Sequence, residues 1–284
     1  MAIKFGPAGH SASFFERYSK LEDLPIYLSN FRLNAYEYQC GHGIRISQSA
    51  AQKFGKLMAK SGIYLSVHSP YYISIASVDE EKRLNSVKYI LQTAEIAKAM
   101  GAERIVVHAG SCAKISRNQA MDFAKTTLKM AIDELKSSGL ESVHICPETM
   151  GKVNQLGTIE EIFELCAQDV SIIPCIDFGH MDARGQGSLP DEASFEKIFE
   201  AIENNLGYCK LKNMHIHFSK VEFTSGGERR HCTFEEQHFG ADFKHLLNVV
   251  IKKHCQPVII CESSGTQAED AKTMKDYYMA NVGE

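Results

Sequence analysis

The hydrophobic pattern of the chain consists of eight short apolar or β-branched runs separated by longer, more polar segments. The runs have the length of buried β-strands, and several are apolar at consecutive positions, as in RIVVHAG from Arg104. The runs begin at Ile3, Asn34, Ile63, Arg104, Ser142, Ile172, Asn213 and Pro257. We interpret each of them as one strand.

The segments between the runs carry apolar residues at helical spacing. One such series starts at Leu84 and ends before Gly101, and another starts at Phe123 and ends before Gly139. A glycine at the end of such a series is typical of a helix C-terminus. Thr158 and Glu161 have the spacing of a capping box, so they predict the start of a further helix.

Strand and helix therefore alternate through eight units, which predicts a (β/α)8 TIM barrel of the α/β class. A length of 284 residues suits one such barrel, so we expect a single domain over residues 1–284. An open, doubly wound sheet is the alternative. Residues 219–239 form the longest atypical loop, and a loop at that end of a barrel strand usually serves the site.

Composition adds limits on partners and compartment. The net charge of −4 shows no basic excess, so contact with nucleic acid requires a local patch or bound cations. The first twenty residues lack the pattern of a signal peptide, and no apolar stretch is long enough to span a membrane. Nine cysteines without a CxxC pair are typical of free thiols in a reducing compartment. We therefore expect a cytoplasmic protein without a membrane segment or disulfides.

Histidines and acidic residues recur at the C-terminal ends of six expected strands. They are His68, His108, Glu148, Asp177, His180, His215, His217 and Glu262. In a barrel these ends share one face, and carboxylates that crowd together there require counter-charge. Imidazole and carboxylate donors without thiolates suit zinc, with manganese or iron as second choices, and their number exceeds the need of one tetrahedral ion. A lone histidine is more often structural, but the repetition over six strands favours a metal cluster.

Six ordered segments that hold these residues resemble the motifs of the endonuclease IV family. The segments are VHSPY (67–71), VVHAG (106–110), CPETMG (146–151), CIDFGHMDARG (175–185), NMHIHFSK (213–220) and ICES (260–263). The resemblance spans almost the whole chain. It implies a (β/α)8 barrel with three zinc ions that hydrolyses the phosphodiester on the 5′ side of an abasic nucleotide in damaged double-stranded DNA.

The resemblance also implies a role for individual residues. Glu148 would bridge two ions and act as the catalytic carboxylate, and the remaining ligands would divide among three ions. Asp177, His215 and Glu262 would complete one ion, His68 and His108 a second, and His180 and His231 would hold the third. Tyr71 matches a tyrosine that the family places against DNA. The candidate phosphate contacts are Arg45, Arg184, Lys220, Arg229 and Arg230, although for any one of them a solvated surface charge is the commoner role.

One ligand of the family is missing. The family has an Asp-x-His pair after the seventh strand, where this chain has Arg229, Arg230 and His231. Glu228 or His217 are the candidate substitutes, since zinc accepts either donor; without a substitute, two ions would remain. The loop CGHGIRIS (40–47) does not match the DNA-inserting loop of the family, and FEEQHFG (234–240) is altered.

These observations favour a monomeric zinc-dependent endonuclease in which a metal-activated hydroxide, oriented by Glu148, attacks phosphorus. A metal-dependent sugar isomerase or epimerase is the first alternative. It would share Glu148, Asp177, His215 and Glu262 but would not require the other histidines. A catalytically silent protein that binds DNA or metal is the second alternative.

Overall fold

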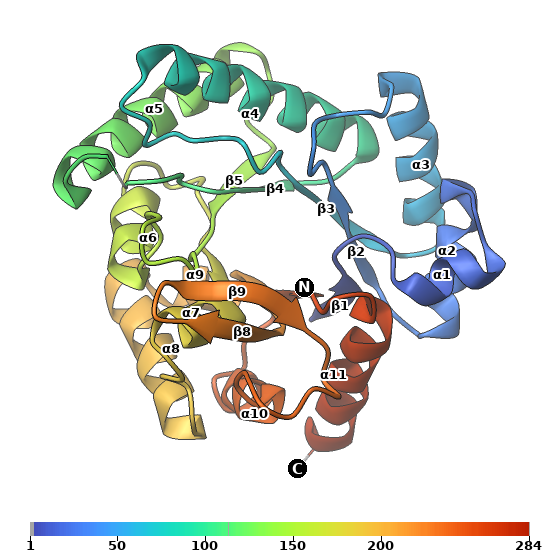
Figure 1. Ribbon diagram of the computed structural model, residues 1–284. Helices are drawn as coiled ribbons and strands as arrows, with labels where there is room; N and C mark the ends of the chain where they lie inside the picture. The colour runs from blue at the N-terminus through green and yellow to red at the C-terminus, as the bar shows by residue number, and fades with distance from the viewer. Residues whose placement is uncertain (1–2, 113, 284) are drawn as a thin grey trace. The chain divides into compact units, whose positions relative to one another are not determined.

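The computed structural model describes residues 3–112 and 114–283, which form two compact units. The first unit comprises Met1–Glu37 and Ile176–Glu284, and the second unit comprises Tyr38–Cys175. Figure 1 shows the order of the elements by colour. Within the described residues, no helix is both long and apolar enough to cross a membrane.

The second unit contains β3, β4 and β5, which belong to a sheet in the order β2-β3-β4-β5. The strand β2 begins in the first unit, which includes Glu37, and ends in the second. Ile105 pairs with Val67 on one side and with Ile145 on the other, and all three side chains are buried. The helices α3, α4, α5 and α6 follow the strands (Figure 1). The bounds are β2 Ala35–Gln39, α3 Gln48–Lys60, β3 Tyr64–His68, α4 Glu80–Met100, β4 Arg104–Val107, α5 Arg117–Ser137, β5 His144–Pro147 and α6 Ile159–Cys166.

The first unit contains four parallel strands in the order β1-β10-β7-β6. Val258 of β10 pairs with Lys4 of β1 and with His215 of β7. The bounds are β1 Lys4–Pro7, α1 Ala12–Arg17, η1 Leu21–Asp23, α2 Leu24–Asn30, β6 Cys175–Asp177, α7 Phe178–Arg184, α8 Glu192–Leu206, α9 Tyr208–Lys212, β7 His215–Phe218, β8 Lys220–Thr224, β9 Gly227–Cys232, α10 Phe243–Lys252, β10 Val258–Cys261 and α11 Gln267–Asn281.

The local signals in the sequence act as expected. All eight apolar runs contain a strand, and all four residues of β4 and of β10 are buried. Gly101 ends α4 in the left-handed conformation, with a φ of 74°. The Thr158 hydroxyl oxygen accepts from the Glu161 N–H, and the Glu161 carboxylate accepts from the Thr158 N–H, which confirms the capping box.

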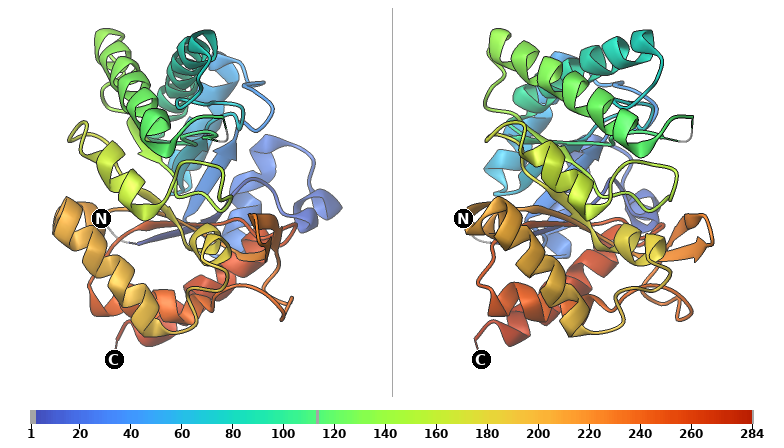
Figure 2. Two further views of the ribbon diagram at one scale, coloured as in Figure 1. Left: turned by 60° about the vertical axis from the view of Figure 1, so that its left-hand side comes forward. Right: turned by 90° about the vertical axis from the view of Figure 1, so that its left-hand side faces the viewer.

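The β8–β9 hairpin was not expected, because we interpreted residues 219–239 as an irregular loop. Its second strand, β9, carries charged residues at successive positions, Glu228, Arg229 and Arg230, instead of an apolar run. Hydrophobic periodicity does not detect such a strand. The hairpin is coloured orange in Figure 2 and stands out from the other strands of the first unit.

Gly179 lets the start of α7 approach this hairpin closely. A Cβ at this position would lie 2.4 Å from the Ser219 carbonyl oxygen and 2.9 Å from a methyl carbon of Val221. The carbonyl belongs to the backbone and cannot move aside as a flexible side chain would. The glycine therefore fixes how the Asp177–His180 turn packs against the start of β8.

We expect Gly179→Ala to destabilise the protein by about 1–3 kcal/mol, the usual cost of overpacking a tight site. Chemical denaturation of the metal-free protein measures this change. Gly226→Ala is the matched control, because the nearest atom to its added Cβ lies 3.7 Å away. Equal stability of the two variants would show that the close approach at Gly179 is not a constraint.

Candidate metal centre

Two histidines and one glutamate meet in the second unit. His68 ends β3, and His108 and Glu148 each follow the last residue of their strand. The Oε2 atom of Glu148 lies 3.4 Å from Nε2 of His68 and 3.0 Å from Nε2 of His108. The Glu148 side chain is buried, so three residues expected from strand-end logic form one compact donor group.

The hydrogen bond of His68 shows which ring nitrogen carries the hydrogen and which one has a free lone pair. Its Nδ1 lies 2.8 Å from the Ser69 carbonyl oxygen, which only accepts, so Nδ1 carries the hydrogen. In the neutral ring, Nε2 then presents a lone pair toward the carboxylate oxygen. Two electron-rich atoms that face each other suit a cation between them. An imidazole whose other nitrogen donates to a carbonyl oxygen, as Nδ1 of His68 does, is typical of metal ligands.

A second donor group lies in the first unit and includes a candidate substitute ligand. Nε2 of His180 lies 3.5 Å from one oxygen of Glu228, and Nε2 of His231 lies 4.0 Å from the other. The ring centroids of the two histidines are 5.4 Å apart. Glu228 thus stands beside the two histidines, and the three residues could hold a metal ion.

A β-bulge brings Glu228 to this position. Val221 pairs with His231 and Glu222 with Arg230, but Phe223 pairs with Glu228, so that the strand register skips Arg229. The extra residue reverses the alternation of faces. Glu228 and His231 therefore share one face, although they are three residues apart.

Arg229 and Arg230 do not enter this donor group. Arg229 donates to Glu222, whose carboxylate also accepts from Arg230, and Arg230 donates to Glu236 as well. Both arginines are exposed. The Arg229 cation is thus paired with a carboxylate at the surface.

A third donor group, also in the first unit, comprises Asp177, His217 and Glu262. One ligand atom of each lies within 4.8 Å of the others, and Nδ1 of His217 is 3.5 Å from Oε1 of Glu262. The Asp177 side chain caps α7 by accepting the His180 N–H at 2.7 Å. The resemblance implied His215 in this place, whereas His217 was a candidate substitute for the missing ligand of the third ion.

The register of β7 explains this difference. His217 pairs with Ile260, two residues before Glu262, whereas His215 pairs with Val258. His215 therefore lies about 7 Å deeper along the strand, because each residue advances it by about 3.3 Å. The two histidines share a face, but His217 is the one near the C-terminal strand ends.

Glu37 is a buried residue of this region that sequence reasoning missed. Its Oε2 lies 3.0 Å from Nε2 of His215, and its Oε1 lies 3.1 Å from Nε2 of His217. Burial acts to raise the pKa of this carboxyl, but its interactions with His217 and His215 lower the pKa well below its usual range. The available signal was an acidic residue inside the apolar run that begins at Asn34.

The candidate DNA contacts have different surroundings. The Tyr71 side chain is 57 % exposed and packs edge-on against His42, so its ring is available to a large ligand. Arg45 is exposed and Arg184 is half-buried at the end of α7. Lys220 donates to the carbonyl oxygens of Phe234 and Glu236, which favours a structural role for it.

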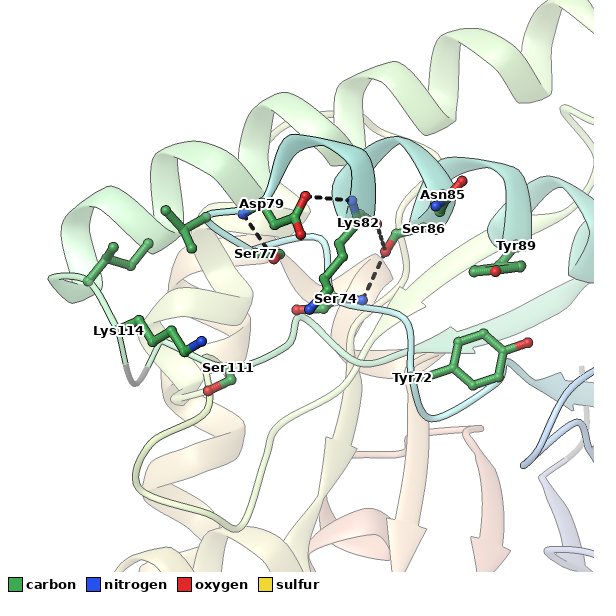
Figure 3. Close-up of a pocket in the computed structure, with 12 residues that line it drawn as sticks. Tyr72, Ser74, Ser77, Asp79, Lys82, Asn85, Ser86, Tyr89, Ser111 and Lys114 are labelled. Carbon is green, nitrogen blue, oxygen red and sulfur yellow. Dashed lines mark hydrogen bonds between the residues drawn. The ribbon is translucent and has the colours of Figure 1, made fainter.

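A pocket of about 740 Å³ lies in the second unit, next to the loops that follow β3 and β4 (Figure 3). These loops start from His68 and His108. Figure 3 shows Lys82 extending from α4 toward Ser74, and Lys114 beside Ser111. The lining residues are Tyr72, Ser74, Ser77, Val78, Asp79, Lys82, Asn85, Ser86, Tyr89, Ser111, Lys114 and Ile115. Hydroxyl and ammonium groups suit a phosphate-bearing ligand.

Comparison with known proteins defines the class. The chain belongs to the family of xylose isomerase-like TIM barrels, which it matches over residues 31–278. An uncharacterized protein of Methanocaldococcus jannaschii is 33 % identical over 273 residues, 96 % of each chain. A relative named probable endonuclease 4, from Mycoplasma pneumoniae, is 30 % identical over 208 residues, 72 % of this chain and 68 % of the relative. The predicted resemblance to endonuclease IV is confirmed.

Solved structures agree on the fold. A D-tagatose 3-epimerase-like protein aligns over 99 % of this chain and 98 % of its own, with a TM-score of 0.74 and 20 % identity. Endonuclease IV from Thermus thermophilus aligns over 98 % and 99 %, with a TM-score of 0.68 and 16 % identity. The fold is therefore a TIM barrel, and the predicted fold class is correct. At these identities the similarity shows the fold alone.

The His180–Glu228–His231 group generates a specific expectation for metal content. We expect Glu228→Gln to lower the zinc bound per chain by about one ion, because the amide keeps the shape but loses the charge that holds a divalent cation. Elemental analysis after dialysis against micromolar zinc measures the content. Arg229→Ala is the control and should leave the content unchanged, whereas unchanged zinc in Glu228→Gln would exclude this residue as a ligand.

Proposed function

We propose that the protein is a zinc-dependent endonuclease that hydrolyses the DNA phosphodiester 5′ to an abasic site. The observation that carries the proposal is the donor group of His68, His108 and Glu148. A reaction that converts a small molecule at a single metal ion does not require this group. The group around Glu228 supports the proposal, because it supplies a carboxylate and two imidazoles despite the change to Arg229.

Bound zinc would supply the Lewis acidity that lowers the pKa of water toward 7 and offsets the phosphate charge. The side chains have separate tasks. Glu148 accepts a hydrogen bond from the attacking water and aims it at phosphorus, and its burial keeps bulk water away. His68 keeps a fixed orientation through the Ser69 carbonyl. Asp177 fixes the turn that carries His180.

Binding of damaged duplex DNA draws support from the second unit. The exposed ring of Tyr71 offers a stacking surface, and the pocket with Lys82 and Lys114 offers cations and hydroxyls to the backbone of a strand. Arg45 adds an exposed charge. The proposal includes action as a monomer in the cytoplasm, where reducing conditions keep the nine free cysteines as thiols.

A sugar isomerase or epimerase remains the second candidate, favoured by the Asp177–His217–Glu262 group. Two carboxylates and one imidazole are sufficient to hold the single ion that proton transfer on a polyol requires. Such a reaction would not use the donor group of His180, Glu228 and His231. A silent binding protein would need none of these geometries.

We expect the zinc-loaded protein to incise a labelled duplex 5′ to a single abasic analogue, and a strong chelator to abolish the cut. Glu148→Gln should lower the rate at least about 100-fold, as expected for loss of a group that acts in proton transfer. A gel assay measures incision. Glu164→Gln is the control, since it neutralises an exposed glutamate of the same unit. Bound zinc without incision would reject the nuclease and direct the search to sugars and their phosphates.

The pocket in the second unit allows an independent test of DNA binding. We expect the double variant Lys82→Ala, Lys114→Ala to weaken binding to the lesion duplex and to reduce the slope of log Kd against log salt by about 1.8, because each phosphate contact contributes about 0.9. Fluorescence anisotropy between roughly 50 and 200 mM salt suits the measurement. Lys129→Ala, an exposed change on α5, serves as the control. An unchanged slope would show that Lys82 and Lys114 do not contact the DNA backbone.

A further inference from the structure

Glu37 holds two histidines of β7 at once, and its side chain and both of theirs are fully buried. We propose that Glu37 is a positioning residue: its two oxygens fix both imidazoles with hydrogen on Nε2, so that His217 presents the lone pair of Nδ1 to a metal ion. The inference rests on the proposed metal centre but does not depend on the substrate.

The contacts with Glu37 point to one tautomer of each ring. An ionised carboxylate only accepts hydrogen bonds, and its oxygens lie 3.0 Å from Nε2 of His215 and 3.1 Å from Nε2 of His217, so both nitrogens face an acceptor, which favours hydrogen on Nε2. A neutral imidazole that carries its hydrogen on Nε2 has its lone pair on Nδ1. Nδ1 of His217 lies 3.5 Å from Oε1 of Glu262, on the side of Asp177 and Glu262. The lone pair of Nδ1 thus points to the donor group and not away from it.

One carboxylate can serve both rings because of the strand geometry. His215 and His217 are two residues apart in β7 and share a face, with ring centroids 5.1 Å apart. Their Nε2 atoms meet different oxygens of Glu37. A residue with a single acceptor oxygen would orient only one of them.

The second unit has the opposite arrangement. His68 gives its Nδ1 hydrogen to a carbonyl oxygen and keeps the lone pair on Nε2. The acceptor behind each ring therefore decides which nitrogen can bind a metal ion. For His217 that acceptor is the side chain of Glu37, on a strand that is distant in the sequence. A substitution of Glu37 can therefore test the role of the acceptor.

Glu37→Gln separates this role from a merely structural one. Glutamine has nearly the same shape but offers one acceptor oxygen and one NH₂ donor. If the NH₂ group donates to one ring, that ring must accept on Nε2 and carry its hydrogen on Nδ1. The tautomer of one histidine should therefore switch while the packing is preserved.

The experiment uses metal-free full-length protein labelled with ¹⁵N-histidine and long-range ¹H–¹⁵N correlation, with His215→Gln and His217→Gln for assignment. We expect hydrogen on Nε2 in both rings of the native protein and on Nδ1 in one ring of Glu37→Gln. Asp270→Asn, which neutralises another buried carboxylate of the first unit, should leave both rings unchanged. Thermal unfolding confirms that each variant is folded.

Titration with cobalt as a spectroscopic probe gives the second readout. We expect Glu37→Gln to weaken cobalt binding about 10- to 100-fold, the usual effect of removing the group behind a metal-binding histidine. Hydrogen on Nδ1 of His217 in the native protein, or a variant with neither a tautomer switch nor weaker binding, would overturn the proposal. Neither readout requires DNA, so absence of incision would reject the nuclease and leave the role of Glu37 intact.

Discussion

Buried carboxylates are the constraint on which the arrangement of this protein depends. The side chains of Glu37, Glu148 and Asp177 are fully buried. An ionised carboxylate removed from water loses several kcal/mol of solvation, which only close donors or cations can offset. Imidazoles from neighbouring strand ends supply part of this compensation, and the N–H at the start of α7 supplies another part.

The same compensation orients the side chains before any ligand arrives. A ring that donates to a fixed acceptor loses both its rotational freedom and its choice of tautomer. His68 is held by a carbonyl, and His217 by Glu37. Ligands held in this way need little rearrangement to bind a metal ion, which is the usual requirement for a functional centre.

The hairpin places a carboxylate beside two histidines, although Arg229 stands where the resemblance implied a ligand. The sequence places an arginine where the resemblance requires an aspartate, and a regular strand would put that arginine beside His231. The bulge at Arg229 shifts the register by one residue and brings Glu228 to the same face. Arg229 then pairs with Glu222 at the surface. His180, Glu228 and His231 together supply one carboxylate and two imidazoles.

Local signals were sufficient for the regular part of the fold. Apolar runs determined the eight parallel strands, glycine and capping residues determined helix ends, and strand-end logic brought His68, His108 and Glu148 together correctly. Each of these inferences depends on residues within one element or on the general rule that parallel strands end at the same edge.

Only the tertiary structure decided which partner each side chain meets. Glu37 and His215 are 178 residues apart, and no periodicity connects them. The choice of His217 over His215 depends on the register between β7 and β10, and the position of Glu228 depends on a bulge. The sequence by itself thus determined the strands and the kinds of donor at their ends. Pairing across strands decided which donors meet, because register and long-range contacts are set by the packing of the whole sheet.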